Sequence, residues 1–219
     1  MFNIKRRAPG IGLHIGSKYA ALSIVKRSGN VIKALDCGSI PLSGAYEGSL
    51  LDDDPEALGR RLANLVKEMN CRGRGVVAAA PASQIYLRNI TLPWMKAKDL
   101  RTAAYFEAMT FLPVPVEEAA FDIFPVREFH DGEVKKVELF FVAARRQTVR
   151  NLDVTCQTAG LRLMAVELET TAIGRLLDEH VDSQVFLYIG DQYSIFCVLR
   201  YGAVVFQHYF PWGGDSLES

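Results

Sequence analysis

The chain has 219 residues, enough for one or two domains with a sizeable core. Its 25 basic and 25 acidic residues balance, and 49% of the residues are hydrophobic, an ordinary composition for a soluble globular protein. Balanced charge gives no general attraction to nucleic acid or to an anionic membrane. The longest apolar runs, such as residues 76–80, are far below the roughly 20 residues that span a bilayer. We therefore expect a cytoplasmic protein without a membrane span.

The cysteine and histidine patterns indicate neither a metal centre nor a catalytic triad. The four cysteines are Cys37, Cys71, Cys156 and Cys197. They form no C-x-x-C pair, and no histidine lies at ligand spacing from any of them. We expect them to be reduced core residues of a cytosolic protein.

The first segment begins with three predicted strands, at residues 11–15, 20–26 and 31–37. Apolar side chains at every second position from Ile11 onward predict a strand with one buried face. The Ser-Gly-Asn sequence at residues 28–30 predicts a turn between the second and third strands.

A helix and a buried strand follow. Asp54 is a typical N-cap, and Pro55 suits the first helical position. The predicted apolar face of this helix consists of Leu58, Leu62, Leu65, Val66 and Met69. Such a face predicts a helix that packs on the sheet. Residues 75–80 then predict a short buried strand.

The middle segment predicts the order strand, helix, strand, strand, helix. The predicted ranges are 84–92, 97–111, 119–127, 134–144 and 147–159. Gly160 is a typical helix stop. This unit, residues 84–162, is interpreted as a small α+β subdomain inserted into a larger fold. Residues 162–182 return to a strand and a helix.

The last segment repeats the first. Residues 12–19 align with residues 186–193 at a constant offset of 174, which matches Gly16 with Gly190. Residues 27–32 then resemble residues 200–205, one position out of phase. Both copies predict strand, glycine turn, strand, glycine turn, strand. A chance similarity of short strands is the alternative.

A tight glycine turn between strands leaves backbone N–H groups uncovered, and without a Cβ it can approach a phosphate closely. Two such turns facing each other could hold one nucleotide. This arrangement resembles the actin, Hsp70 and sugar-kinase superfamily. The candidate nucleotide-binding residues are Gly16, Ser17, Lys18, Gly190, Asp191 and Gln192.

The sequence departs from the superfamily pattern where acidic residues normally orient Mg²⁺. These positions, two before each glycine, hold His14 and Tyr188. Neutral histidine is a poor Mg²⁺ ligand, and tyrosine carries no charge near neutral pH. Purely structural turns are therefore favoured slightly over nucleotide binding and strongly over rapid hydrolysis. Asp191 is interpreted as a solvated turn residue, with a metal ligand as the alternative.

A closer resemblance covers the chain from about residue 10 to its end. Its segments are Ile90–Pro93, Phe106–Ala108, Leu112–Pro115, Glu117–Asp122, Val142–Arg146, Ala159–Leu161 and Val166–Glu167. In this order they are similar to PilM, the actin-like component of type IV pilus assembly. The middle segment is the most specific part, because it resembles the inserted subdomain that PilM shares with the cell-division protein FtsA.

The resemblance implies an α/β fold of the actin-like ATPase, ribonuclease H-like type with an FtsA-type insertion. Residues 1–83 and 163–182 would form the first actin-like subdomain, and residues 84–162 the inserted one. Residues 183–219 would begin the second actin-like subdomain and leave it incomplete.

The resemblance also implies a function: a cytoplasmic scaffold, peripheral to the inner membrane, that binds the cytoplasmic N-terminal peptide of a PilN-type protein. The candidate peptide contacts are Leu87, Arg88 and Ile90, with simple packing an equal alternative. ATP with Mg²⁺ is the implied cofactor of the full-length protein, which His14 and Tyr188 put in doubt. The alternatives are a working ATPase of the superfamily and a GspL-like domain of a type II secretion platform.

Overall fold

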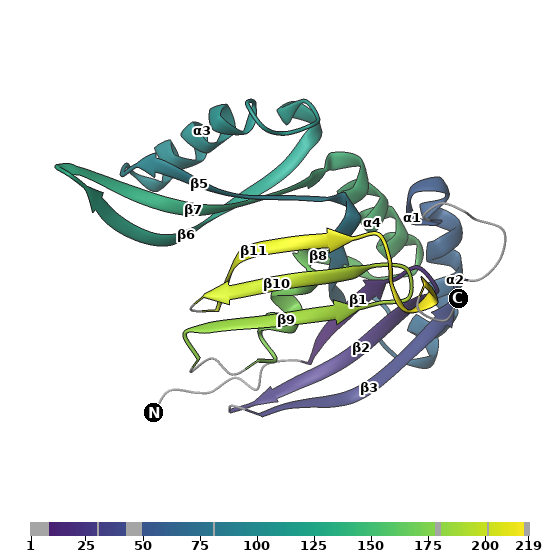
Figure 1. Ribbon diagram of the computed structural model, residues 1–219. Coiled ribbons are helices and arrows are strands. Elements are labelled where there is room, and N and C mark those ends of the chain that lie inside the picture. Colours follow the sequence, from purple (N-terminus) through teal and green to yellow (C-terminus); the bar gives the residue numbers. More distant parts are fainter. Residues whose placement is uncertain are drawn as a thin grey trace, which may run out of the picture. The chain divides into compact units, whose positions relative to one another are not determined.

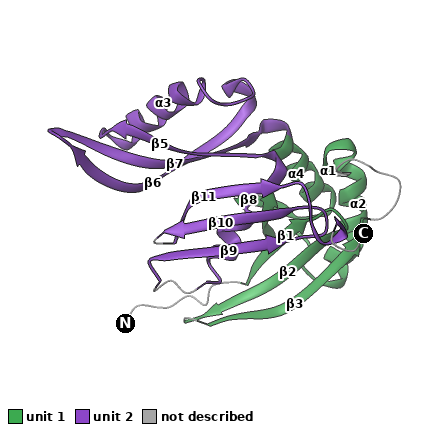
Figure 2. Ribbon diagram, viewed as in Figure 1, with its two compact units in different colours: residues 1–81, 148–167 green, residues 82–147, 168–219 purple. Residues whose placement is uncertain are grey.

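The computed structural model describes residues 9–29, 31–42, 50–80, 82–177, 181–200 and 202–216. They form a mixed α/β protein, as predicted. The chain divides into two compact units, which Figure 2 colours separately. The first unit comprises residues 1–81 and 148–167, and the second comprises residues 82–147 and 168–219.

A five-stranded sheet forms the centre of the first unit, with the strand order β3-β2-β1-β4-β8. The strands are β1 (Gly10–Ile15), β2 (Tyr19–Ser28), β3 (Val31–Pro41), β4 (Gly75–Ala80) and β8 (Arg162–Leu168). The neighbours β1, β2 and β3 are antiparallel, whereas β1 and β4 are parallel. All five strands were predicted. β3 runs beyond its predicted end at residue 37 because it pairs with β2 as far as Pro41.

The helices of this unit cover the apolar face of the sheet. They are α1 (Leu50–Asp53), α2 (Pro55–Glu68) and α4 (Arg146–Thr158). The shared core contains Ile11, Leu13, Ile15, Leu22, Leu58, Leu62, Val66, Leu152 and Cys156. The predicted apolar face of α2 is therefore confirmed. The short helix α1 was not among the predicted elements.

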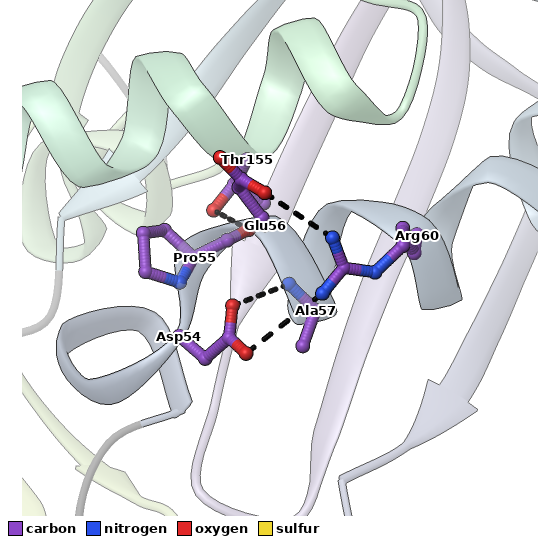
Figure 3. Close-up of polar contacts among 6 residues, drawn as sticks. All are labelled: Asp54, Pro55, Glu56, Ala57, Arg60 and Thr155. Carbon is purple, nitrogen blue, oxygen red and sulfur yellow. Dashed lines mark hydrogen bonds and ion pairs between the residues drawn. The ribbon is translucent and has the colours of Figure 1, made fainter.

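Figure 3 shows how α2 begins. The Ala57 N–H donates a 2.8 Å hydrogen bond to the Asp54 carboxylate, so the predicted N-cap is confirmed. The Thr155 hydroxyl of α4 donates a 3.0 Å hydrogen bond to the Pro55 carbonyl oxygen, which ties α4 to the first turn of α2. Arg60 lies 3.2 Å from Glu56 in an exposed pair one helical turn apart.

The second unit contains a three-stranded antiparallel sheet with the order β5-β7-β6. Its strands are β5 (Ile85–Pro93), β6 (Ala119–Asp131) and β7 (Val134–Arg145). Helix α3 (Ala97–Ala108) lies along one face of this sheet (Figure 1). The core between them contains Ile90, Leu100, Ala104, Val137, Leu139 and Phe141.

The same unit holds a second antiparallel sheet with the order β11-β10-β9. Its strands are β9 (Ser183–Ile189), β10 (Ser194–Arg200) and β11 (Ala203–Phe210), and α5 (Glu169–Gly174) precedes them. One hydrophobic cluster joins the two three-stranded sheets, and it contains Phe140 of β7 with Cys197, Leu199 and Val204 of β10 and β11. The face of the β5-β7-β6 sheet that lies opposite α3 therefore packs against the β9–β11 sheet. The Asn89 side-chain amide also donates a 2.8 Å hydrogen bond to the Val205 carbonyl oxygen.

The packing of two helices differs from the predicted subdomain boundaries. Residues 148–158 of α4 fell in the predicted insertion, residues 84–162, but they pack in the first unit. The reason is that Leu152 and Cys156 are fully buried in its core. Helix α5, predicted to belong with the first subdomain, packs in the second unit. The division into three subdomains stays a prediction.

Candidate functional site

The two predicted copies have the same backbone pairing. Ile15 pairs with Ala20 across the first turn, and Ile189 pairs with Ser194 across the second. Both pairs are related by the offset of 174 residues found in the sequence. The third strand of each copy, β3 or β11, pairs with the second in the antiparallel sense.

A shared irregularity strengthens this equivalence. The ladder between the second and third strands shifts register between Ile24 and Val25 in the first copy. In the second copy it shifts between Val198 and Leu199, again at an offset of 174. A β-bulge is a specific local feature rather than a random defect. The duplication predicted from the sequence is therefore a structural repeat.

The first glycine turn joins β1 to β2. The Gly16 N–H donates a 2.8 Å hydrogen bond to the Tyr19 carbonyl oxygen. A Cβ on Gly16 would lie 3.1 Å from Nε2 of His14 and 3.3 Å from that carbonyl oxygen, so a larger residue would crowd the turn. Ser17 and Lys18, two of the candidate nucleotide-binding residues, are exposed at its tip.

The second glycine turn joins β9 to β10 with the same geometry. The Gly190 N–H donates a 2.8 Å hydrogen bond to the Tyr193 carbonyl oxygen. A Cβ on Gly190 would lie 3.1 Å from that oxygen and 3.1 Å from Cε1 of Tyr188. Asp191 is half-buried and Gln192 exposed. The structure thus groups the six candidate residues as two separate turns, one in each unit; that the turns face each other stays a prediction.

The segment after β11 is hydrogen-bonded to the second turn. The Gly214 N–H donates to the Gly190 carbonyl oxygen at 2.8 Å, and the Asp215 N–H donates to the Asp191 carbonyl oxygen at 2.9 Å. A Cβ on Gly213 would lie only 2.3 Å from the Gly190 oxygen. Glycine at position 213 therefore allows two backbone segments to meet.

A buried carboxylate lies beside this turn. Glu169, the first residue of α5, is 7% exposed. The Tyr193 hydroxyl lies 2.8 Å from Oε1 and 2.9 Å from Oε2 of this carboxylate. Burial raises the pKa of Glu169 to about 7. Glu169 does not stand out in the sequence, because an acidic residue in the first turn of a helix is ordinary.

The residues in the two acidic positions of the superfamily are neutral. Burial lowers the pKa of His14, which favours the uncharged imidazole. Burial, and then the nearby charges of Glu169 and Asp191, raise the pKa of Tyr188. Among the described residues, no group of three or more His, Cys, Asp or Glu side chains could hold a metal ion. The backbone of both turns could approach an anion, but neither position supplies the carboxylate that Mg²⁺ prefers.

The three candidate peptide contacts lie on β5 in different surroundings. Ile90 is 5% exposed in the core beneath α3. Leu87 is half-buried on the opposite face, against the cluster shared with β9–β11. Arg88 is exposed, and its guanidinium lies 4.6 Å from the centre of the Phe111 ring. Because β5 is at the edge of its sheet, its backbone can also offer hydrogen bonds to an added strand.

A duplicated unit of three antiparallel strands with glycine turns, combined with an inserted α+β segment, defines an actin-like fold. A sequence profile of the type IV pilus assembly protein PilM family matches residues 12–219. The chain therefore belongs to the PilM family.

Solved structures agree with this assignment. The chain is similar to the one in a PilM–PilN type IV pilus biogenesis complex, with a TM-score of 0.81 and 26% identity. That match covers 96% of this chain and 63% of the other, so this chain spans less than two thirds of the length of its relative.

Two further solved structures share the fold at 13% identity. The cytoplasmic domain of EpsL from the type II secretion system of Vibrio cholerae has a TM-score of 0.58, with coverage of 93% of this chain and 71% of that domain. The ethanolamine utilization protein EutJ from Carboxydothermus hydrogenoformans has a TM-score of 0.52, with coverage of 99% and 57%. In the described part of the chain, no helix is long and apolar enough to cross a membrane.

Proposed function

We propose that this PilM-family protein is a scaffold of an inner-membrane assembly complex, where it binds the cytoplasmic N-terminal peptide of a PilN-type membrane protein. The observation that carries the proposal is the match to the PilM–PilN complex over 96% of this chain. In this proposal the protein lies in the cytoplasm and reaches the inner membrane through its partner. EpsL is only 13% identical to this chain, so the similarity supports the shared fold alone. A role in a type II secretion platform is therefore the second candidate, after a role in pilus assembly.

The edge of β5 is the proposed attachment site for the peptide. An extended peptide can extend a sheet at an unpaired edge, where main-chain hydrogen bonds supply affinity and alternate side chains supply specificity. Arg88 is exposed beside that edge, on the same side as Phe111. Ile90 and Leu87 would act indirectly, because their side chains help to hold the strand in place from opposite faces.

Titration calorimetry with a synthetic peptide tests this site. The peptide is the cytoplasmic N-terminal segment of a PilN-type protein. We expect saturable binding that weakens at least tenfold in Arg88→Glu. Arg127→Glu is the matched control, because Arg127 is an exposed arginine stacked on Phe129 at 5.0 Å on the other edge strand. Equal loss in both variants, or no binding at all, would refute the site.

We further propose that the two glycine turns are degenerate nucleotide-binding turns with little or no catalytic turnover. The same hydrogen bond closes both turns, which supports an equivalent role for the two. In the full-length protein their backbone would contact phosphate, with ATP and Mg²⁺ as candidate ligands. His14 and Tyr188 remove the carboxylates that would orient the metal and the attacking water. Mg²⁺-dependent ATP hydrolysis that is rapid, and abolished by Gly16→Val, would instead establish the ATPase alternative.

A further inference from the structure

Charge is distributed unevenly between the two units of this neutral chain. The first unit, residues 1–81 and 148–167, carries 14 basic and 9 acidic residues, a net charge of +5. The second unit carries 11 basic and 16 acidic residues, a net charge of −5. Cations that are concentrated in one region can attract an anionic partner even when the charges of the whole chain cancel.

The basic residues of the first unit gather at one end of its five-stranded sheet. At this end β1, β4 and β8 begin and the β2–β3 hairpin turns (Figure 1). Gly10, the first residue of β1, pairs with Val25 of β2, so the end of β2 extends past β1. The Arg162 N–H donates a 2.9 Å hydrogen bond to the Arg74 carbonyl oxygen, so β4 and β8 begin at the same level. From one edge of the sheet to the other, the cations at this end are Lys33, Lys26, Arg27, Arg74, Arg72 and Arg162. We call this set the basic end.

Backbone groups, rather than carboxylates, hold three of these side chains. Arg74 donates a 2.7 Å hydrogen bond to the Pro9 carbonyl oxygen, and Arg27 donates a 3.0 Å hydrogen bond to the Gly29 carbonyl oxygen. Arg72 lies along the backbone at Gly160, where a Cβ would be 3.1 Å from its Cγ. In the part of the chain that the structure describes, no carboxylate forms a salt bridge with any cation of the basic end.

The arrangement of these cations is unfavourable for the isolated sheet. Lys26 and Lys33 lie directly opposite each other in the β2–β3 ladder, and like charges in such a pair destabilise a hairpin. Two exposed carboxylates, Asp36 and Glu68, lie on elements near this end, but the six cations outnumber them. Four further acidic residues of the unit lie at the start of α2, a helix length of about 20 Å away. They are Asp52, Asp53, Asp54 and Glu56.

The extent of the basic end fits a surface rather than a single bound ion. Neighbouring strands lie about 4.8 Å apart, so cations that reach from β3 to β8 span about 20 Å. The large apolar side chain of Met164 adjoins them on β8 and is 59% exposed. Its Cγ would lie 2.7 Å from a Cβ on Gly75, the residue after Arg74. Cations beside an exposed apolar side chain are typical of a surface that contacts lipid headgroups.

We infer that the basic end of the first unit binds an anionic lipid surface. This contact would be a second attachment to the inner membrane, and it needs neither the PilN-type peptide nor a nucleotide. Each cation contributes little by itself, so binding depends on several of them together and weakens as salt is added. Three more basic residues, Lys5, Arg6 and Arg7, precede Pro9 in the sequence and lie outside the described residues.

Co-sedimentation with lipid vesicles tests the inference on the protein alone. The vesicles are phosphatidylcholine, with or without about one third of phosphatidylglycerol. We expect binding to the anionic vesicles only. Reversing two exposed charges together, Lys33→Glu and Arg162→Glu, should weaken it at least about tenfold. The hairpin should tolerate Lys33→Glu, because the new carboxylate faces Lys26.

The matched control reverses one lysine and one arginine away from the basic end. Lys98→Glu and Arg150→Glu, made together, change the net charge by the same amount at exposed positions near the starts of α3 and α4. We expect this protein to bind the anionic vesicles like the unchanged one.

Three results would overturn the inference: no binding to anionic vesicles, equal weakening in the two double variants, or equal binding to both kinds of vesicle. Tighter binding to duplex DNA than to anionic vesicles would also overturn it and would assign the basic end to nucleic acid. Titration of the Lys33→Glu, Arg162→Glu protein with the PilN-type peptide separates this inference from the proposed function. Unchanged peptide affinity would leave the proposed function standing whatever the vesicles show.

Discussion

The Tyr193 hydroxyl lies 2.8 and 2.9 Å from the two oxygens of the Glu169 carboxylate, and this contact joins α5 to the second glycine turn. The backbone of Tyr193 meanwhile closes that turn by accepting from the Gly190 N–H. A buried carboxylate of α5 is thus linked through one residue to the turn. The Tyr193 ring also stacks on Tyr209, with 5.6 Å between the ring centres.

We predict that Glu169 makes the second unit less stable as the pH rises. Its folded-state pKa of about 7 exceeds the ordinary value of 4.5, so the folded chain holds this proton more tightly than the unfolded chain. Stability therefore falls as the pH rises from about 4.5 to about 7 and levels off above that range. A shift of this size corresponds to a loss on the order of 3 kcal/mol.

Urea unfolding at pH 5 and pH 8, followed by tryptophan fluorescence, measures this effect. Both tryptophans, Trp94 and Trp212, lie in the second unit. Glu169→Gln is expected to flatten the pH dependence, since an amide does not titrate in this range. The difference between the two proteins cancels the contributions of other groups, such as His14. An unchanged slope in Glu169→Gln would disprove the assignment.

Removing the Tyr193 hydroxyl should destabilise the second unit at pH 8. Tyr193→Phe keeps the stack on Tyr209 but leaves the charged carboxylate without this donor, at a cost of about 1–3 kcal/mol. The loss should be smaller at pH 5, where the carboxyl group is protonated. Tyr209→Phe is the control, because the described residues show no hydrogen bond from its hydroxyl. Equal losses in the two variants would contradict the prediction.

The adjacent glycines Gly213 and Gly214 allow a matched test of the segment that follows β11. In Gly213→Ala the new Cβ would lie 2.3 Å from the Gly190 oxygen and 2.5 Å from the Asp191 oxygen, so the backbones must separate. In Gly214→Ala it would lie 3.7 Å from the Gly190 oxygen, an ordinary contact. We expect Gly213→Ala to cost at least about 2 kcal/mol of unfolding free energy and Gly214→Ala to cost less than about 0.5 kcal/mol. Similar values for both would refute this account.

Local sequence signals predicted most of the fold. Alternating apolar side chains from Ile11 onward predicted β1, the N-cap Asp54 predicted the start of α2, and Gly160 predicted the end of α4. The repeat was also visible, because Gly16 and Gly190 must avoid a Cβ in the same turn geometry. These signals act within a few residues, so one sequence is enough to detect them.

Packing between distant segments could not be predicted in this way. Glu169 reads as an ordinary first-turn acid until Tyr193, 24 positions away, is placed against it. Ile90 and Arg88 both lie on a predicted strand, yet only the fold shows that one is buried beneath α3 and the other is exposed. The packing of α4 with α2 depends likewise on contacts about 100 residues apart in the chain, such as that between Thr155 and Pro55.

The contact between α2 and α4 gives a prediction for the first unit. Alanine in place of a helical glycine normally stabilises a helix by about 1 kcal/mol. At Gly59 the sign should reverse, because the new Cβ would lie 2.5 Å from Cβ of Thr158 and 2.7 Å from the Thr155 carbonyl oxygen. Two backbone segments cannot yield as a flexible side chain can, so Gly59→Ala should destabilise the unit by about 2–4 kcal/mol.

The measurement is the thermal unfolding of the first unit, followed by hydrogen exchange of its sheet amides. Arg60→Ala is the control on the same helix, since its ion pairs with Asp54 and Glu56 are exposed and contribute less than about 1 kcal/mol. If Gly59→Ala raises the stability, α4 does not approach α2 this closely. Faster exchange across β1 and β2 in Gly59→Ala, with no change in Arg60→Ala, would show that the close helix contact holds the core of this unit.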